Sequence, residues 1–327
     1  MNAASPLRFG AAAGGLLLGA TLLVANAPLE FALASVFLFA GPHNWMEFRY
    51  AVARLPSRLA VFRRFFSVAL GGIVLLTVGS WAIPGAARFG GSARSAAMWA
   101  LLWNLSLVGW IAGLAYLRSR ERPVRDWPWL LPVALAIGAL VCVAPTAWSL
   151  ALVYAHPVVS FVVLDRELRR HHRQWRQVYH VALAAVPLAI VLLCWTLRDA
   201  PPLAGEGTDA LTMRLVAHAG AREIPILSTR ALVATLALLE LLHYAVWIVA
   251  LPVVTGQGAP WRTVRAAITR GWVTRQRAFR LALGLGAAAV LTLWIAFTAD
   301  YARARDLYFT LAIAHVLAEV PVVLRLV

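Results

Sequence analysis

Four histidines lie inside apolar stretches of this chain: His43, His156, His243 and His315. An ionisable side chain in hydrocarbon is costly, and such residues usually face a cavity or a partner. Neutral imidazole is a good ligand for iron, zinc and copper. Four imidazoles that four separate helices carry to one depth can converge on a metal ion. The sequence therefore predicts these four histidines as metal ligands.

A glutamate precedes His243 by about one helical turn. Glu240 and His243 stand at i, i+3, so both side chains share one face of a helix. Bundle proteins with di-iron sites use this spacing for two metal ligands. The spacing therefore predicts Glu240 as a further ligand. Histidine and carboxylate ligands with open positions suit non-haem iron(II) and oxygen chemistry, so iron is the expected metal, with zinc and copper as alternatives.

Two more glutamates follow candidate ligands by one turn. Glu47 follows His43 and Glu319 follows His315, both at i, i+4. A metal-bound imidazole is oriented by an acceptor on its second ring nitrogen, and a carboxylate can be that acceptor. We therefore expect Glu47 and Glu319 to orient imidazoles at a catalytic site. A haem between two histidines is an alternative. Membrane cytochromes usually stack two haems at different depths, however, whereas the four histidines of this chain are expected in one layer.

The composition places these residues in a membrane. The chain has 327 residues, of which 61% are hydrophobic and 13% charged, and its mean hydropathy is +0.75. The surface of a soluble domain with this composition would be too apolar. Apolar runs of about 18 to 22 residues recur from end to end, which is typical of membrane-spanning helices. We expect an all-α polytopic bundle that forms a single transmembrane domain over residues 1–327, with no soluble domain.

Ten apolar stretches are expected to span the bilayer. They lie at about 10–27, 29–48, 67–84, 95–117, 128–146, 147–164, 179–197, 228–251, 281–299 and 307–325. If both termini are cytoplasmic, 22 of the 30 basic residues fall on the cytoplasmic side, and all 30 are arginines. This asymmetry follows the positive-inside rule. It favours ten spans with both ends inside, in the inner membrane of a bacterium.

The net charge of +16 does not indicate a nucleic-acid partner, because the arginines lie in short loops between apolar spans. They are interpreted as topology determinants that contact anionic lipid head groups. Segments 49–66 and 261–280 alternate arginine with apolar residues, which is typical of an amphipathic helix at the membrane surface.

The polar residues of the spans follow a directional pattern. In the ten-span arrangement the even-numbered spans run from outside to inside, and they carry all four histidines together with Asn104. Each histidine lies roughly 6 to 11 residues from its cytoplasmic helix end, or about 9–16 Å deep at about 1.5 Å per residue. The four histidines are therefore expected in one layer, on the cytoplasmic side of the midplane.

Part of the chain resembles the Brp/Blh family of membrane carotene-cleaving dioxygenases. Gly41-Pro42-His43 resembles the family's Gly-x-Pro-His element, and the run from His156 to His172 is loosely similar to a later element rich in histidine and arginine. The family's aspartate after the first histidine is absent, and Asn44 and Glu47 stand there instead. The resemblance covers about a fifth of the chain. It implies an iron oxygenase that acts on a lipid such as a carotenoid.

Three functions are compatible with these patterns. The first is a membrane-embedded metalloenzyme, an iron-dependent oxygenase whose substrate is an apolar lipid or carotenoid. The second is an ion- or proton-coupled transporter that uses the same histidines and glutamates as a relay. The third is a non-catalytic subunit of a membrane complex, with the arginine-rich face as its docking surface. The sequence leaves the oligomeric state open.

Overall fold

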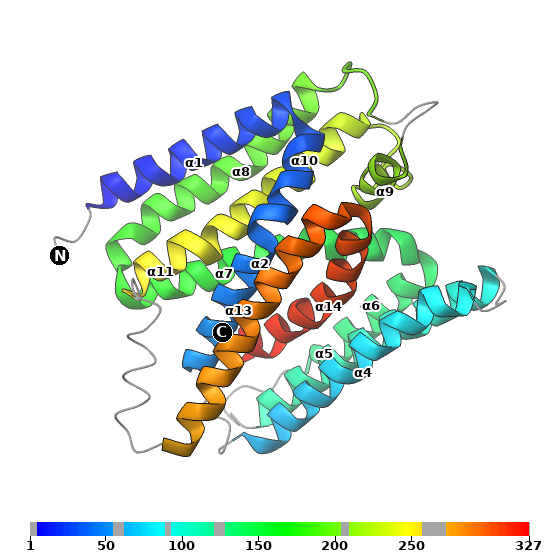
Figure 1. Cartoon of the computed structure of the whole chain (residues 1–327), viewed down its shortest axis with the longest axis vertical. Coiled ribbons are helices and arrows are strands. Elements are labelled where there is room, and N and C mark those ends of the chain that lie inside the picture. Colours follow the sequence, from blue (N-terminus) through cyan, green and yellow to red (C-terminus); the bar gives the residue numbers. More distant parts are fainter. Residues whose placement is uncertain are drawn as a thin grey trace. The chain divides into compact units, whose positions relative to one another are not determined.

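The computed structural model describes residues 5–54, 62–88, 93–120, 128–203, 209–256 and 273–326. These residues are helical, apart from short turns, and contain no β-strand. The helices divide between two compact units, one of residues 1–48 and 153–302 and one of residues 49–152 and 303–327. Figure 1 labels the helices.

Within the described ranges, six helices are long and apolar enough to cross a membrane, which fits a membrane protein. Each of the ten stretches expected to span falls on a helix, and the number that cross the bilayer stays a prediction. Of the expected surface helices, residues 49–54 continue α2 and residues 63–66 begin α4. Residues 55–61 and 261–272 lie outside the described residues.

The first unit contains most of the helices, and two of them, α2 and α7, continue into the second unit. The helices of the first unit are α1 (Pro6–Asn26), α2 (Pro28–Arg54), α7 (Pro145–His171), the 3-10 turn η1 (Arg173–Trp175), α8 (Arg176–Thr196), α9 (Ala210–His218), α10 (Thr229–Ala245), the π-helical turn η2 (Val246–Ala250), α11 (Leu251–Val254) and α13 (Val273–Ala299). Prolines open α1, α2 and α7, where the missing N–H has no intrahelical partner to lose.

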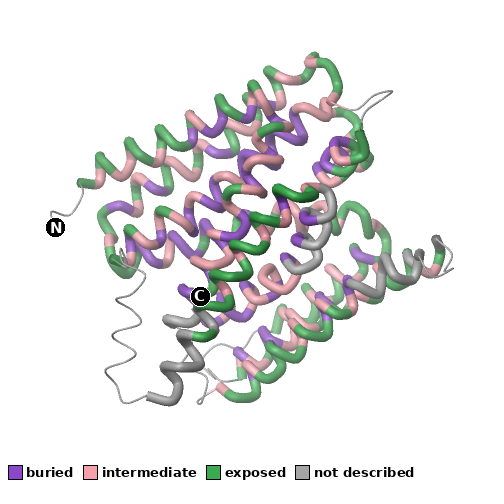
Figure 2. Tube along the Cα trace, in the orientation of Figure 1, coloured by how far each residue is buried: buried purple, intermediate pink, exposed green. Residues whose placement is uncertain are grey.

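Helix α10 is the core of the first unit. It packs against α1 and α8, and every residue from Ala231 to Leu239 is buried (Figure 2). A helix that is apolar on all sides must be surrounded by other elements or by lipid. Its N-terminus is fastened to the end of α8, since the hydroxyl of Ser228 donates to the carbonyl of Leu197 at 2.6 Å.

Contacts inside the first unit fix the helix directions. The rings of Phe9 and Trp175 stack at 4.9 Å, so α1 and α8 begin at the same end. Helix α10 begins where α8 ends, and α2 begins where α1 ends. Helices α2, α7 and α10 therefore run in one direction, opposite to α1 and α8. This agrees with the expectation for three of the four histidine-bearing helices.

Helices α2 and α13 pack closely and antiparallel. A Cβ on Gly41 would lie 2.8 Å from Val290 Cγ1, and one on Gly286 would lie 2.6 Å from Trp45 Cζ3. The hydroxyl of Tyr301 donates to the carbonyl of Leu33 at 3.0 Å. Small residues let helix backbones approach closely where lipid replaces water as the solvent. This packing supports the stretch of α2 that carries His43.

The second unit contains α4 (Arg63–Arg88), α5 (Ala93–Arg120), α6 (Leu130–Val143) and most of α14 (Tyr301–Leu326), together with the end of α2 and the beginning of α7. Indole nitrogens of α5 donate to carbonyls of α4, from Trp110 to Val68 at 3.0 Å and from Trp103 to Leu76 at 2.7 Å. These bonds make α4 and α5 an antiparallel pair. Leu317 of α14 packs with Leu76 and Leu107.

Candidate metal centre

Three of the four predicted histidines come together inside the first unit. The ring centroid of His243 lies 4.7 Å from that of His156 and 5.3 Å from that of His43. These side chains come from α10, α7 and α2, which are far apart in the sequence. Two imidazoles that share a metal through bonds of about 2 Å have centroids about 5 Å apart. The spacing therefore fits a set of metal ligands.

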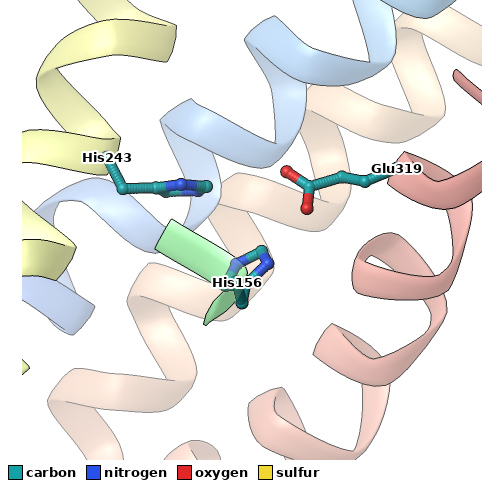
Figure 3. Close-up of side chains that lie close together, drawn as sticks. All are labelled: His156, His243 and Glu319. Atoms are coloured by element: carbon teal, nitrogen blue, oxygen red, sulfur yellow. The ribbon is translucent and has the colours of Figure 1, made fainter. Parts of the chain in front are cut away.

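His243 is the central member of this histidine cluster. Its side chain is 2% exposed, and one of its ring nitrogens lies within 4.8 Å of a ring nitrogen of His156. Figure 3 shows these two imidazoles next to each other. Neither ring nitrogen of His243 makes a hydrogen bond of good geometry to a described residue, although the carbonyl of Pro157 lies toward the ring. Buried polar nitrogens normally have a partner, so a ligand is a natural one here.

His43 is held in a defined orientation. Its Nδ1 lies 2.9 Å from the carbonyl oxygen of Phe39, one turn earlier on α2, and its ring lies 4.5 Å from the ring of Tyr244. A carbonyl oxygen can only accept, so Nδ1 must carry the proton of this hydrogen bond. In a neutral imidazole Nε2 then has the lone pair. A backbone carbonyl that fixes the tautomer in this way is typical of metal-binding histidines.

A π-helical turn follows His243. The backbone N–H of Leu251 donates to the carbonyl of Val246, five residues earlier. Pro252 explains this wider turn, because proline has no N–H and its ring clashes with the carbonyl four residues before it, that of Ile248. Such turns occur often at functional sites. Pro252 therefore shifts the helix register directly after His243 and Tyr244.

Two of the predicted glutamates lie in the first unit, each about one helical turn from a histidine of the cluster. Glu47 is buried on α2, after His43. Glu240 is half-buried on α10, before His243, and is an electrostatic neighbour of Tyr154 on α7. Because α2 and α10 run in the same direction, the two carboxyls lie on opposite sides of the histidine layer. Glu240 as a ligand and Glu47 as an orienting group stay predictions.

His315 and Glu319 belong to α14, in the second unit. Glu319 is buried and His315 is half-buried. Figure 3 also draws Glu319. Their predicted roles, as a ligand and as an orienting carboxylate, stay predictions from the sequence.

Asn104, also predicted in the polar layer, has partners within the second unit. Its side-chain oxygen accepts from the indole nitrogen of Trp148 at 3.0 Å, and its amide nitrogen donates to the carbonyl of Ala100 at 2.9 Å. Both functional groups of this side chain are therefore used in holding α5 and the beginning of α7.

Sequence reasoning missed two features of the site. One is the Phe39 carbonyl as the acceptor for His43, and the other is the π-helical turn after Tyr244. The signals were present, because residue 39 stands four before His43 and Pro252 stands soon after His243. Every residue type has a backbone carbonyl. The sequence therefore does not show which carbonyl accepts a hydrogen bond from a histidine side chain.

Comparison of the chain with models of protein families, with curated proteins and with solved structures finds no match. The function is therefore inferred from the geometry of the histidine cluster and from the sequence.

Proposed function

We propose that this protein is a membrane-embedded metalloenzyme whose metal is held by His43, His156 and His243. The observation that carries the proposal is the pair of short ring distances, 4.7 and 5.3 Å, that join these three histidines through His243. Three imidazoles so close together in a packed hydrocarbon environment can share one metal ion. Purely structural membrane histidines bond instead to a neighbouring helix.

The chemistry of the donor set fits a transition metal. Neutral imidazoles suit iron, zinc and copper, and Glu240 can add the carboxylate that favours non-haem iron(II). The Nδ1–H bond of His43 to Phe39 leaves Nε2 as the donor atom. We propose iron as the resident metal, with zinc and copper as alternatives that metal analysis separates.

The proposed reaction is oxidation of an apolar lipid, such as a carotenoid, by molecular oxygen. Bound iron would supply the activation of oxygen. The protein's own groups hold the imidazoles in place, and the buried side chains of Tyr244 and Trp247 help to keep water away from the cluster. The substrate class is supported by the apolar surroundings and by the family resemblance of the segment around His43.

We also propose the membrane arrangement expected from the sequence. The chain crosses the inner membrane of a bacterium ten times with both termini in the cytoplasm, which the distribution of its arginines supports. In this arrangement His315 is a further ligand candidate and Glu319 a further orienting carboxylate. Each is tested by the same metal analysis, with His315→Ala and Glu319→Gln.

Proton relay in a transporter is the second candidate function. It is favoured by the two carboxyls, Glu240 before and Glu47 after the histidine layer along parallel-running helices. Titratable groups that lie one after another along the membrane normal can pass a proton from each group to the next. This candidate expects uptake in proteoliposomes that follows a pH gradient and needs no metal.

The deciding experiment is elemental analysis of protein that has met neither metal-affinity resin nor chelator. We expect about one equivalent of iron, zinc or copper in the wild type. His243→Ala and His156→Ala should lose it, while the matched control His218→Ala, on α9, should keep it. Thermal unfolding of each variant verifies that it is folded.

Full metal retention by folded His243→Ala would contradict the assignment of His243 as a metal ligand. Folded wild-type protein that takes up no metal after aerobic reconstitution with each ion would favour the relay. If iron is present, incubation with carotenoids in air should consume substrate and oxygen together. Consumption that is equal in the His243→Ala variant would exclude the cluster as the reaction centre.

A further inference from the structure

The turn between α7 and α8 is fastened by a charged cluster. Arg176 donates to both oxygens of Asp165, from Nε at 2.8 Å and from Nη2 at 2.9 Å. His180 Nε2 lies 2.7 Å from Asp165 Oδ1. A paired arginine–carboxylate contact fixes geometry as well as adding stability. The end of α7 is therefore held against the beginning of α8.

Aromatic packing fixes the same turn from inside. The ring of Trp175, in η1, stacks on His172 at 4.1 Å and on Phe9 of α1 at 4.9 Å. The hydroxyl of Tyr179 donates to the carbonyl of Phe161 at 2.8 Å. These contacts join α1, α7 and α8 at one end of the first unit. The side chains on the outside of the turn are thus carried by a rigid frame.

The acidic side chains of this turn form ion pairs with basic side chains of the same turn. The side chain of Glu167 is fully buried and lies 3.4 Å from both Arg170 and His171. Asp165 is occupied by Arg176 and His180. Residues 165–180 contain five arginines and only these two acids. The surface that the turn presents is therefore positively charged.

Two arginines of the turn remain for an external partner. Arg169 and Arg173 are exposed, and neither makes an ion pair with any residue in the part of the chain that the structure describes. Exposed apolar side chains lie nearby on the same helices, with Val162 on α7 43% exposed and Val181 on α8 72% exposed. Free cations beside exposed aliphatic surface suit a molecule with an anionic head and apolar chains.

We propose that the α7–α8 turn is a binding site for an anionic phospholipid. Arg169 and Arg173 bind the head-group phosphate, and the acyl chains lie along Val162 and Val181. Arginine matches phosphate geometry with two parallel hydrogen bonds. Both α7 and α8 are long and apolar enough to cross a membrane, so the turn between them falls at head-group level. The proposal does not depend on the metal centre.

The test compares an Arg169→Gln/Arg173→Gln variant with the wild type in neutral detergent. Phosphatidylglycerol or phosphatidylcholine is titrated in, and bound lipid is counted by native mass spectrometry. We expect the wild type to prefer phosphatidylglycerol. Each arginine near the surface contributes about 1 kcal/mol, so the double variant should bind it roughly thirtyfold more weakly. Arg198→Gln, at the other end of α8, is the matched control and should bind like the wild type.

Equal affinity of the wild type and the folded double variant for phosphatidylglycerol would overturn the proposal. Inorganic phosphate that binds the wild type as tightly as phosphatidylglycerol does would also overturn it, because that result would identify a simple anion site. If the double variant does not fold, the wild type still decides: bound phosphatidylglycerol must dissociate as salt is raised, and salt-independent binding would contradict the role of the arginines. Metal content of the variant should equal that of the wild type.

Discussion

The imidazole of His43 donates its Nδ1 proton to the carbonyl oxygen of Phe39 at 2.9 Å, one turn earlier on the same helix. This hydrogen bond restricts the two torsion angles of the side chain to one ring orientation and selects one tautomer. The Tyr244 ring, 4.5 Å away, covers the same imidazole. The orientation and the tautomer of His43 are therefore fixed before any metal binds, and NMR can detect this tautomer.

We predict that His43 in metal-free protein is a neutral imidazole with the proton on Nδ1. Solid-state NMR of protein labelled with nitrogen-15 at histidine should give the shift pair of this tautomer. His43→Ala, which removes the signal, assigns it. A proton on Nε2 would contradict the Phe39 hydrogen bond and, with it, the choice of Nε2 as the donor atom.

Gly286 should be intolerant of any side chain. Alanine there puts a Cβ 2.6 Å from Trp45 Cζ3, so the indole ring or one of the two helices must shift. We expect Gly286→Ala to lower the free energy of unfolding by about 1–3 kcal/mol, the usual range for overpacking. Because Trp45 is two residues from His43, metal affinity should fall as well.

Gly284 provides the control for this substitution, because a Cβ there meets nothing within 4 Å. Gly284→Ala should unfold at the wild-type temperature or slightly above it, since alanine favours helix over glycine by about 1 kcal/mol. Thermal unfolding in one detergent compares the two variants. Equal unfolding temperatures would mean that α2 and α13 are not packed through Gly286.

Asn104 should act as a structural residue. Its side-chain oxygen accepts from Trp148 Nε1 at 3.0 Å, and it is 6% exposed. Asn104→Ala leaves that indole N–H without its acceptor, which should cost about 1–3 kcal/mol of stability. Adding Trp148→Phe should recover part of the loss, because the stranded donor is removed. Metal content should stay unchanged in each variant, and metal loss in folded Asn104→Ala would contradict a purely structural role.

Asp209 should make the N-terminus of α9 sensitive to acid. Its carboxylate accepts from the Thr212 hydroxyl at 2.6 Å and from the backbone N–H groups of Leu211 and Thr212. These bonds, the Thr212 hydroxyl first, lower the pKa of Asp209 below its ordinary value of 3.8. The stabilisation is therefore complete above the unfolded pKa and is lost as the pH falls through the lower folded pKa.

Hydrogen exchange measures this effect at the cap. At about pH 6, Asp209→Ala should speed exchange of the Leu211 and Thr212 amides relative to the wild type, because an N-cap acceptor is removed. After correction for intrinsic rates, the difference between wild type and variant should shrink as the pH falls through the lowered folded pKa of Asp209, because the carboxyl then becomes protonated. A difference that persists unchanged into acid would show that the charge of Asp209 is not what caps α9.

The sequence was sufficient for the helical architecture. Long apolar runs with prolines at their starts, such as the runs that begin at Pro28 and Pro145, form helices in hydrocarbon, because a helix satisfies the backbone groups within its own segment. It also gave three members of the cluster, His43, His156 and His243, because ionisable residues are conspicuous among apolar ones. The shared direction of their helices followed from counting spans.

The tertiary structure decided which way those side chains face. Helix α10 is apolar on nearly all sides, so its sequence carries no periodic signal for the face that His243 occupies. Rotation and approach depend instead on side-chain shape, such as the fit of Trp45 against Gly286 and of Val290 against Gly41. These contacts join residues 241 and 249 positions apart in the chain. No local pattern encodes them, because in hydrocarbon helix packing is decided by shape complementarity rather than by an apolar stripe.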